Sequence, residues 1–171
     1  MRHVEKMVIG VLLGCSPAYA ETGKAVLKPT AEGSSIAGSA QFTDSAEGLK
    51  VLVSISQAPP GKHGLHIHQF GSCEDGAKAA GGHYNPDNVM HGFLVTDGFS
   101  KAHAGDFGNI EVGPDGTGRL ELTIPGLNLA GGKHTIGGRA VVLHEKPDDF
   151  GQPTGNAGGR IGCGTIAITS D

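Results

Sequence analysis

Apolar and polar residues alternate along many short segments of the chain, and turn-forming residues separate these segments. Alternation with a period of two is typical of half-buried β-strands, because successive side chains of a strand point to opposite faces. No segment shows the period of an amphipathic helix. The pattern predicts eight strands, at residues 25–28, 36–43, 49–56, 64–70, 109–112, 119–124, 139–145 and 160–169.

Composition supports this interpretation, because the 171 residues include 30 glycines and no tryptophan. Short strands joined by many turns suit such a composition, and Gly113-Pro114-Asp115-Gly116 is a strong hairpin signal. The length fits one domain. We therefore expect a single all-β domain, an eight-stranded antiparallel sandwich or barrel. Its two long connections, 71–108 and 146–159, have a length that is usually functional or disordered.

The first twenty residues have the features of an export signal. Arg2 and Lys6 give a positive start, and residues 7–14 form an apolar run that is too short to span a bilayer. Ala18-Tyr19-Ala20 fits a cleavage site. We therefore predict a signal peptide at residues 1–20, export of the chain, and no transmembrane segment.

The cysteines agree with export of a mature domain at 21–171. Cys15 leaves with the signal, or it carries a lipid and anchors the protein to a membrane if cleavage occurs before it. The remaining pair, Cys73 and Cys163, predicts a disulfide in an oxidising compartment. Two free buried thiols are the alternative.

Histidines are concentrated in a way that suggests metal binding. His66 and His68 are two residues apart on an expected strand, so both project from one face while Ile67 points into the core. His144 sits similarly, with Leu143 turned inward. A few solvent-facing histidines are the alternative, which weakens once the ligand types in the long loop are added: His83, His91, His103 and Asp106. Such a set has too many ligands for one tetrahedral ion and predicts two metals, zinc or copper.

Five motifs occur in the order that is typical of one enzyme family. They are G-x-H-G-x-H-x-H at 61–68, G-G-H-Y-N-P at 81–86, H-x-G-D-x-G-N at 103–109, H-E-K-P-D-D at 144–149 and G-N-A-G-G-R-x-x-C-G at 155–164. With these motifs the chain resembles the copper/zinc superoxide dismutases, in particular the bacterial exported kind. The resemblance implies an immunoglobulin-like Greek-key barrel with two functional loops, and a periplasmic location.

The resemblance also implies two ligand sets that share one residue. Copper would be bound by His66, His68, His83 and His144. Zinc would be bound by His83, His91, His103 and Asp106. His83 would then serve both ions as a bridging imidazolate, which requires two cations to remove both ring protons.

Further residues acquire roles through the same resemblance. Asp148 would accept hydrogen bonds from His66 and His91 and orient both rings, with Asp149 as the competitor for this role. Arg160 would meet the substrate anion, or anchor the disulfide loop, and both roles are compatible. Thr154 would narrow the opposite wall of the channel.

Two other histidines match no ligand position. We expect His63 to be a satisfied structural histidine and His134 to be an exposed turn residue. The chain departs from the animal cytosolic pattern at Cys73, five residues after His68 as in bacterial members, and in the longer spacing between His91 and His103, which are twelve positions apart.

Charge indicates how a substrate would be attracted. The net charge of −4 gives no indication of a nucleic-acid partner, and an anion would need a local positive guide. Residues 150–159 contain no charged side chain. Animal members of the family place charged residues that guide the substrate in this segment, so the guidance here must be weaker or come from elsewhere. Candidates for this role are Lys62, Lys101 and Lys146.

The implied activity is the conversion of superoxide to oxygen and hydrogen peroxide, an antioxidant reaction, by alternate reduction and oxidation of the copper. His83 would leave copper on reduction, take a proton and deliver it to the peroxide, and Arg160 would bind the anion. A non-catalytic copper-binding or copper-delivery protein on the same fold is the alternative, and a domain that retains zinc alone is a third hypothesis. The sequence leaves open whether the chain is a monomer or a homodimer.

Overall fold

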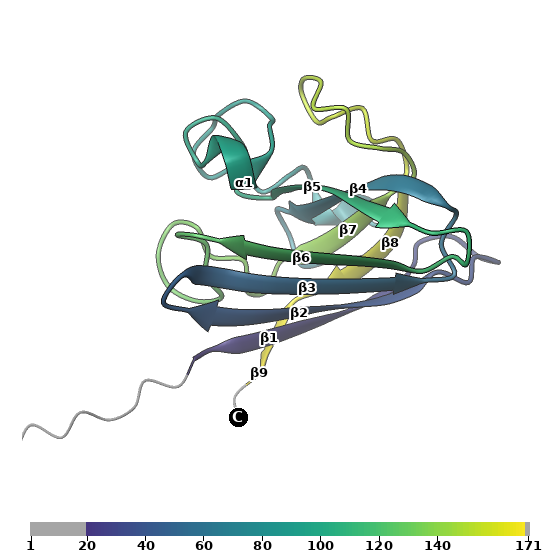
Figure 1. The fold of residues 1–171 in the computed structure, drawn as a ribbon, viewed down its shortest axis with the longest axis horizontal. Coiled ribbons are helices and arrows are strands. Elements are labelled where there is room, and N and C mark those ends of the chain that lie inside the picture. Colours follow the sequence, from purple (N-terminus) through teal and green to yellow (C-terminus); the bar gives the residue numbers. More distant parts are fainter. Residues whose placement is uncertain (1–19, 170–171) are drawn as a thin grey trace, which may run out of the picture.

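The computed structural model describes residues 20–169, so residues 1–19 of the predicted signal segment, with Cys15, lie outside the described part. The described residues form an all-β barrel (Figure 1). Its strands are β1 Thr22–Pro29, β2 Ala37–Ser45, β3 Gly48–Ser56, β4 Gly61–His68, β5 Asp106–Val112, β6 Gly118–Ile124, β7 Ala140–His144, β8 Arg160–Thr165 and β9 Ala167–Thr169.

The strand order is β2-β3-β6-β5-β4-β7-β8-β1-β9, and β1 also pairs with β2. This last pairing closes β1 to β8 into a ring of antiparallel strands, with β9 added beside β1. The connections from β3 to β4 and from β6 to β7 skip two strands each, which is the Greek-key pattern. The predicted eight-stranded antiparallel barrel is therefore confirmed.

The barrel core follows the predicted alternation on most strands. In β3, for example, Leu49, Val51 and Val53 are buried and Lys50 is exposed. β4 and β7 differ, because their last residues are buried on both faces. The two long connections, 71–108 with its short helix and 146–159, lie on this side of the barrel (Figure 1), and Ala77 and Ala80 of the first pack against Val142 of β7.

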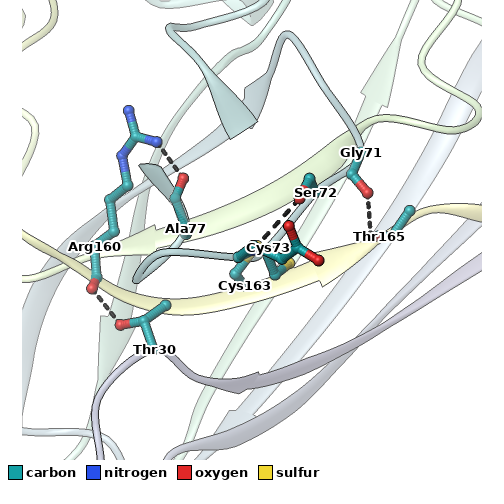
Figure 2. Close-up of a disulfide and its surroundings, with 9 residues drawn as sticks. Thr30, Gly71, Ser72, Cys73, Ala77, Arg160, Cys163 and Thr165 are labelled. Carbon is teal, nitrogen blue, oxygen red and sulfur yellow. Dashed lines mark hydrogen bonds between the residues drawn. A yellow bond between two sulfur atoms is a disulfide. The ribbon is translucent and has the colours of Figure 1, made fainter. Parts of the chain in front are cut away.

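A disulfide fixes the first of these loops to the barrel. Cys73 of the loop and Cys163 of β8 are bonded, with their Cα atoms 5.7 Å apart, which confirms the predicted bridge (Figure 2). Ala77, Ala80 and Val142 pack around it in a small apolar cluster on the outside of β7 and β8. The loop therefore has its own buried contacts with the outer face of the sheet.

Two boundaries differ from the predicted ones for identifiable reasons. The predicted strand 160–169 divides at Ile166, whose N–H donates to the carbonyl oxygen of Arg139 at 2.8 Å while its side chain enters the core. The predicted strand 64–70 ends at His68, because Gln69 and Phe70 bond instead to the carbonyl oxygens of Gly82 and Ala80 in the loop.

The long connection 71–108 also contains short helices. These are the 3₁₀ helix η1 Lys78–Ala80 and the single-turn helix α1 Leu94–Asp97. None of the helices in residues 20–169 has the length and apolar character needed to cross a bilayer.

Candidate metal centre

Neighbouring strands β4 and β7 bring three of the predicted ligands together. His66 and His68 lie on one face of β4, and Ile67 between them is buried in the barrel core, as predicted. A register shift precedes His66 in β4 and another precedes His144 in β7. Such bulges redirect side chains near functional sites. The Nε2 atoms of His68 and His144 lie 3.2 Å apart.

Backbone pairing carries His83 from the loop to the same place. The Gln69 N–H donates to the Gly82 carbonyl at 2.9 Å, and the Tyr84 N–H donates to the Ile67 carbonyl at 2.8 Å. His83 therefore continues the sheet as an antiparallel bridge partner of His68. Its ring centroid lies 4.0 Å from that of His66.

Asp106, the first residue of β5, gathers the second set of predicted ligands. Its Oδ1 lies 2.9 Å from Nδ1 of His83 and 3.1 Å from Nδ1 of His103. Its Oδ2 lies 2.9 Å from Nδ1 of His91. The backbone N–H groups of Gly92 and His103 also donate to Oδ2, which fixes the carboxylate.

The two sets meet at His83. In each set the four candidate ligand atoms lie within 4.8 Å of one another, and all seven residues are buried. The sets are His66, His68, His83 and His144, and His83, His91, His103 and Asp106. The structure thus brings together every ligand that the resemblance implied, from three strands and one loop.

Two buried nitrogen atoms test whether these sets fit metal ions. Nδ1 of His66 and Nδ1 of His91 are buried without a hydrogen-bond partner in the protein. For His91 the nearby Asp106 oxygen lies at 2.9 Å but outside hydrogen-bond geometry. Unpaired buried polar atoms are costly. An imidazole set suits copper, and three imidazoles with one carboxylate suit zinc.

Asp148 forms hydrogen bonds with one histidine of each set. Its Oδ2 accepts a hydrogen bond from Nε2 of His66 at 2.8 Å, and its carboxylate accepts another from Nε2 of His91 at 3.0 Å. Gly155, at φ +74°, packs on this pair so closely that an added Cβ would lie 2.0 Å from Asp148 Oδ1. Asp149 bonds instead to Gly151 and Asn156 within its own loop.

Sequence reasoning missed the residue that holds Asp148. Asn109 accepts the Asp148 N–H at 2.7 Å and donates to the Asp148 carbonyl at 2.9 Å. Asn109 closes the H-x-G-D-x-G-N motif, so the motif contained the signal. Its partner, 39 residues away, could not be read from the motif alone.

The environment shifts the pKa values of the ring nitrogens in opposite directions. Burial lowers the pKa of His68 to about 2, of His83 to about 4 and of His144 to about 3. Burial would also lower the pKa of His91, but the adjacent carboxylates of Asp106 and Asp148 outweigh it and raise the value to about 9. The first three rings are therefore neutral at pH 7 and can bind a cation without first losing a proton.

A cavity of about 360 Å³ opens onto the first set. It is lined by His68, His83 and His144, by Thr154, Asn156 and Ala157, and by Gly82, Gly158 and Arg160. Figure 2 shows the Arg160 guanidinium donating to the Ala77 carbonyl. It also donates to the Gly81 carbonyl at 2.6 Å, which accepts from Nδ1 of His68 as well. Arg160 therefore anchors the disulfide loop, which was the alternative to the anion-binding role, and it also lines the cavity.

The three lysines suggested as guides lie in different places. Lys146 lies beside the cavity, with its stem against the lining residue Gly158. Lys101 borders a separate hollow next to His91. Lys62 lies on β4 opposite Glu111 of β5. Of the three, only Lys146 is next to the cavity lining.

The two histidines without a ligand position behave differently. His63 is buried, with Nδ1 2.9 Å from the His144 carbonyl and Nε2 2.8 Å from the Pro59 carbonyl, which confirms its structural role. His134 lies in a turn, as predicted, but the prediction that it is exposed was wrong. Its half-buried ring stacks on Phe99 with centroids 3.6 Å apart and bonds to Asp87 at 2.6 Å, because two parts of the long loop reach it.

Comparisons with known proteins agree with the geometry. The family model described as Copper/zinc superoxide dismutase (SODC) matches residues 36–166. The chain is 39% identical over 148 residues to the Cu-Zn superoxide dismutase of Onchocerca volvulus, an alignment that spans 80% of this chain and 91% of that protein. It also resembles the crystal structure of the clock protein EA4, with a TM-score of 0.78 and 36% identity over 92% of this chain and 100% of that one.

The free energy of unfolding of the metal-free protein is expected to peak near pH 6.5. Below this pH the unfolded chain takes up protons that folded His68, His83 and His144 exclude until about pH 4 or lower. Each of the three therefore removes about 1.4 kcal/mol per pH unit as the pH falls. His91 acts oppositely, because its contribution is complete below about pH 6.5 and is lost as the pH rises through about 9.

Urea unfolding of chelator-treated protein across this range measures the profile. A stability that does not decline on the acid side would contradict the assignment of these rings as buried and neutral.

Proposed function

The chain belongs to the copper/zinc superoxide dismutase family, and we propose that the two clusters sharing His83 are its copper and zinc sites. It is an enzyme that converts superoxide to oxygen and hydrogen peroxide. The observation that carries the site proposal is the position of one buried imidazole in both clusters. We assign His66, His68, His83 and His144 to copper, and His83, His91, His103 and Asp106 to zinc.

When bound, copper supplies the alternating one-electron chemistry, and zinc fixes and polarises the shared imidazole. The protein's own contribution at His83 is to handle a proton. Its Nδ1 faces Asp106, which leaves Nε2 for the side of the ring near His66 and His68. We propose that His83 holds a proton at Nε2 during the cycle and delivers it to the product peroxide.

Arg160 is proposed as the residue that binds the superoxide anion. Its guanidinium is held by two carbonyl oxygens and lines the cavity together with His68, His83 and Thr154. A fixed guanidinium offers charge and hydrogen bonds to an anion without having to be ordered first. Since the protein as a whole is negative, this local positive charge attracts the substrate at short range.

Asp148 is proposed to orient a ligand of each metal through its bonds to His66 and His91. Such outer carboxylates typically change metal affinity or activity by about 10–100-fold when they are removed.

We further propose that the chain is the bacterial exported type, with a signal peptide at 1–20 and a periplasmic domain at 21–171. The charged start, the apolar run and the A-x-A site support a cleavable signal. The Cys73–Cys163 disulfide supports an oxidising compartment. Lipid attachment at Cys15 is the alternative outcome of the same processing.

Protein loaded with both metals is expected to accelerate superoxide decay with kcat/KM of about 10⁸–10⁹ M⁻¹s⁻¹, a diffusional ceiling that this family is known to reach. Pulse radiolysis, which generates superoxide directly, measures the rate, and elemental analysis establishes the metal content of the same sample. Protein that holds both metals and leaves the decay rate unchanged would instead identify a copper-binding or copper-delivery protein.

The variant His83→Ala is expected to uncouple the two sites, because His83 is the residue common to both ligand sets. In the parent protein, the electron paramagnetic resonance spectrum of copper(II) should change when zinc is added. In the variant it should hardly change. An equal response in both proteins would remove the assignment of His83 as the bridge.

Expression of the full chain in a Gram-negative host is expected to give a periplasmic protein that begins at Glu21. Intact mass and N-terminal sequencing of the osmotic-shock fraction measure the processing. A membrane-bound product that begins at a lipidated Cys15 would establish the anchored form, and an unprocessed cytoplasmic chain would contradict export.

A further inference from the structure

One side chain of the second loop binds both backbone polar groups of His91. The His91 N–H donates to Gln152 Oε1 at 3.1 Å, and Gln152 Nε2 donates to the His91 carbonyl at 2.8 Å. His91 lies in an irregular stretch between β4 and β5 and not in a strand. The Gln152 amide therefore supplies the pairing that a neighbouring strand would otherwise give to this backbone.

The other members of the second ligand set are fixed in a different way. His83 is the bridge partner of His68 in the sheet. The His103 N–H donates to the carboxylate of Asp106, and Asp106 begins β5. Among these four described ligands, His91 is thus the one whose main chain is held by a residue of the loop 146–159.

The segment 148–152 surrounds His91 with contacts of three kinds. The carboxylate of Asp148 accepts from the ring Nε2, and the Phe150 ring stacks on the imidazole with centroids 6.4 Å apart. Gln152 holds the backbone. The Asp148 bond fixes which way the ring faces. The Gln152 bonds fix where the ring is attached.

Gln152 is also an exposed residue, outside the barrel core. It borders a surface hollow together with Met90 and Lys101. Replacing its amide removes two hydrogen bonds without opening a cavity among the buried apolar residues. The effect of a substitution can therefore be separated from loss of the fold.

We propose that Gln152 is a positioning residue for the zinc site, holding the backbone of His91 so that its Nδ1 stays directed at the ion. The inference rests on the proposed assignment of His91 to zinc. It also makes the loop that borders the Arg160 cavity part of the zinc site. Mutation of an outer residue that orients a metal ligand typically lowers metal affinity by about 10–100-fold.

The test compares Gln152→Met, which keeps the length and removes both bonds, with Gln152→Glu, which keeps the acceptor for the His91 N–H. Gln41→Met, at an exposed site on β2, is the matched control. Zinc release from fully loaded protein into excess chromophoric chelator gives the off-rate, and copper retention is measured in the same samples. The absorption spectrum of cobalt(II) in the zinc site reports the ligand geometry.

Gln152→Met should release zinc about 10–100-fold faster than wild type, with an altered cobalt spectrum and copper release changed by less than about twofold. The zinc release rate of Gln152→Glu should lie between those of wild type and Gln152→Met, and that of Gln41→Met should match wild type. Zinc release within about twofold of wild type in Gln152→Met, or equal acceleration for both metals, would overturn the proposal. Failure of wild type to bind two metals would instead overturn the assigned sites, so the two failures are distinct.

Discussion

The centre depends on the hydrogen bonds of the Asp148 carboxylate, because they join it to one histidine ring from each ligand set. One oxygen accepts from His66 on β4, and the same carboxylate accepts from His91 in the long loop. Burial would raise its pKa, but the bonds from the two histidines hold it below its usual value, so it remains an ionised acceptor. The orientation of one site therefore depends on the same charge as the orientation of the other.

The barrel provides a rigid base for this arrangement, and the loops complete it. β4 and β7 supply three histidines at fixed spacing, and their outer faces are buried because the loops cover them. The disulfide and the Arg160 guanidinium attach the loop 71–83 to β8. The Gly81 carbonyl, which accepts from both Arg160 and His68, then joins loop anchoring directly to a proposed ligand.

The sequence allowed the fold to be predicted because most strands obey a local rule. In β3, burial alternates residue by residue, as one solvated face and one core face require. The end of β4 at His68 and the break at Ile166 were harder to predict, because partners distant in sequence determine them. The residue after His68 bonds to Gly82, and Ile166 bonds to Arg139. Local alternation contains no information about such partners.

The same distinction applies to the site. The ligand types and the role of His63 were predictable, because His and Asp at motif spacing are locally recognisable. Asn109 and Gln152 were missed, since each acts on a backbone 39 or 61 residues away. The error at His134 has the same cause, because the Phe99 and Asp87 that cover it belong to a loop whose path follows from its contacts and not from its composition.

Side-chain amides that pair with main-chain groups recur around the site: Asn85 with Val89, Asn109 with Asp148, and Gln152 with His91. Every residue except proline offers the same backbone N–H and C=O. This pairing therefore requires an amide side chain at one position, but it accepts any residue except proline at the position whose backbone is bound. Sequence drift at the held positions is therefore compatible with the pairing, whereas length changes in 93–101 are restricted, because Leu94 of this segment is buried in the core and Phe99 packs against the core.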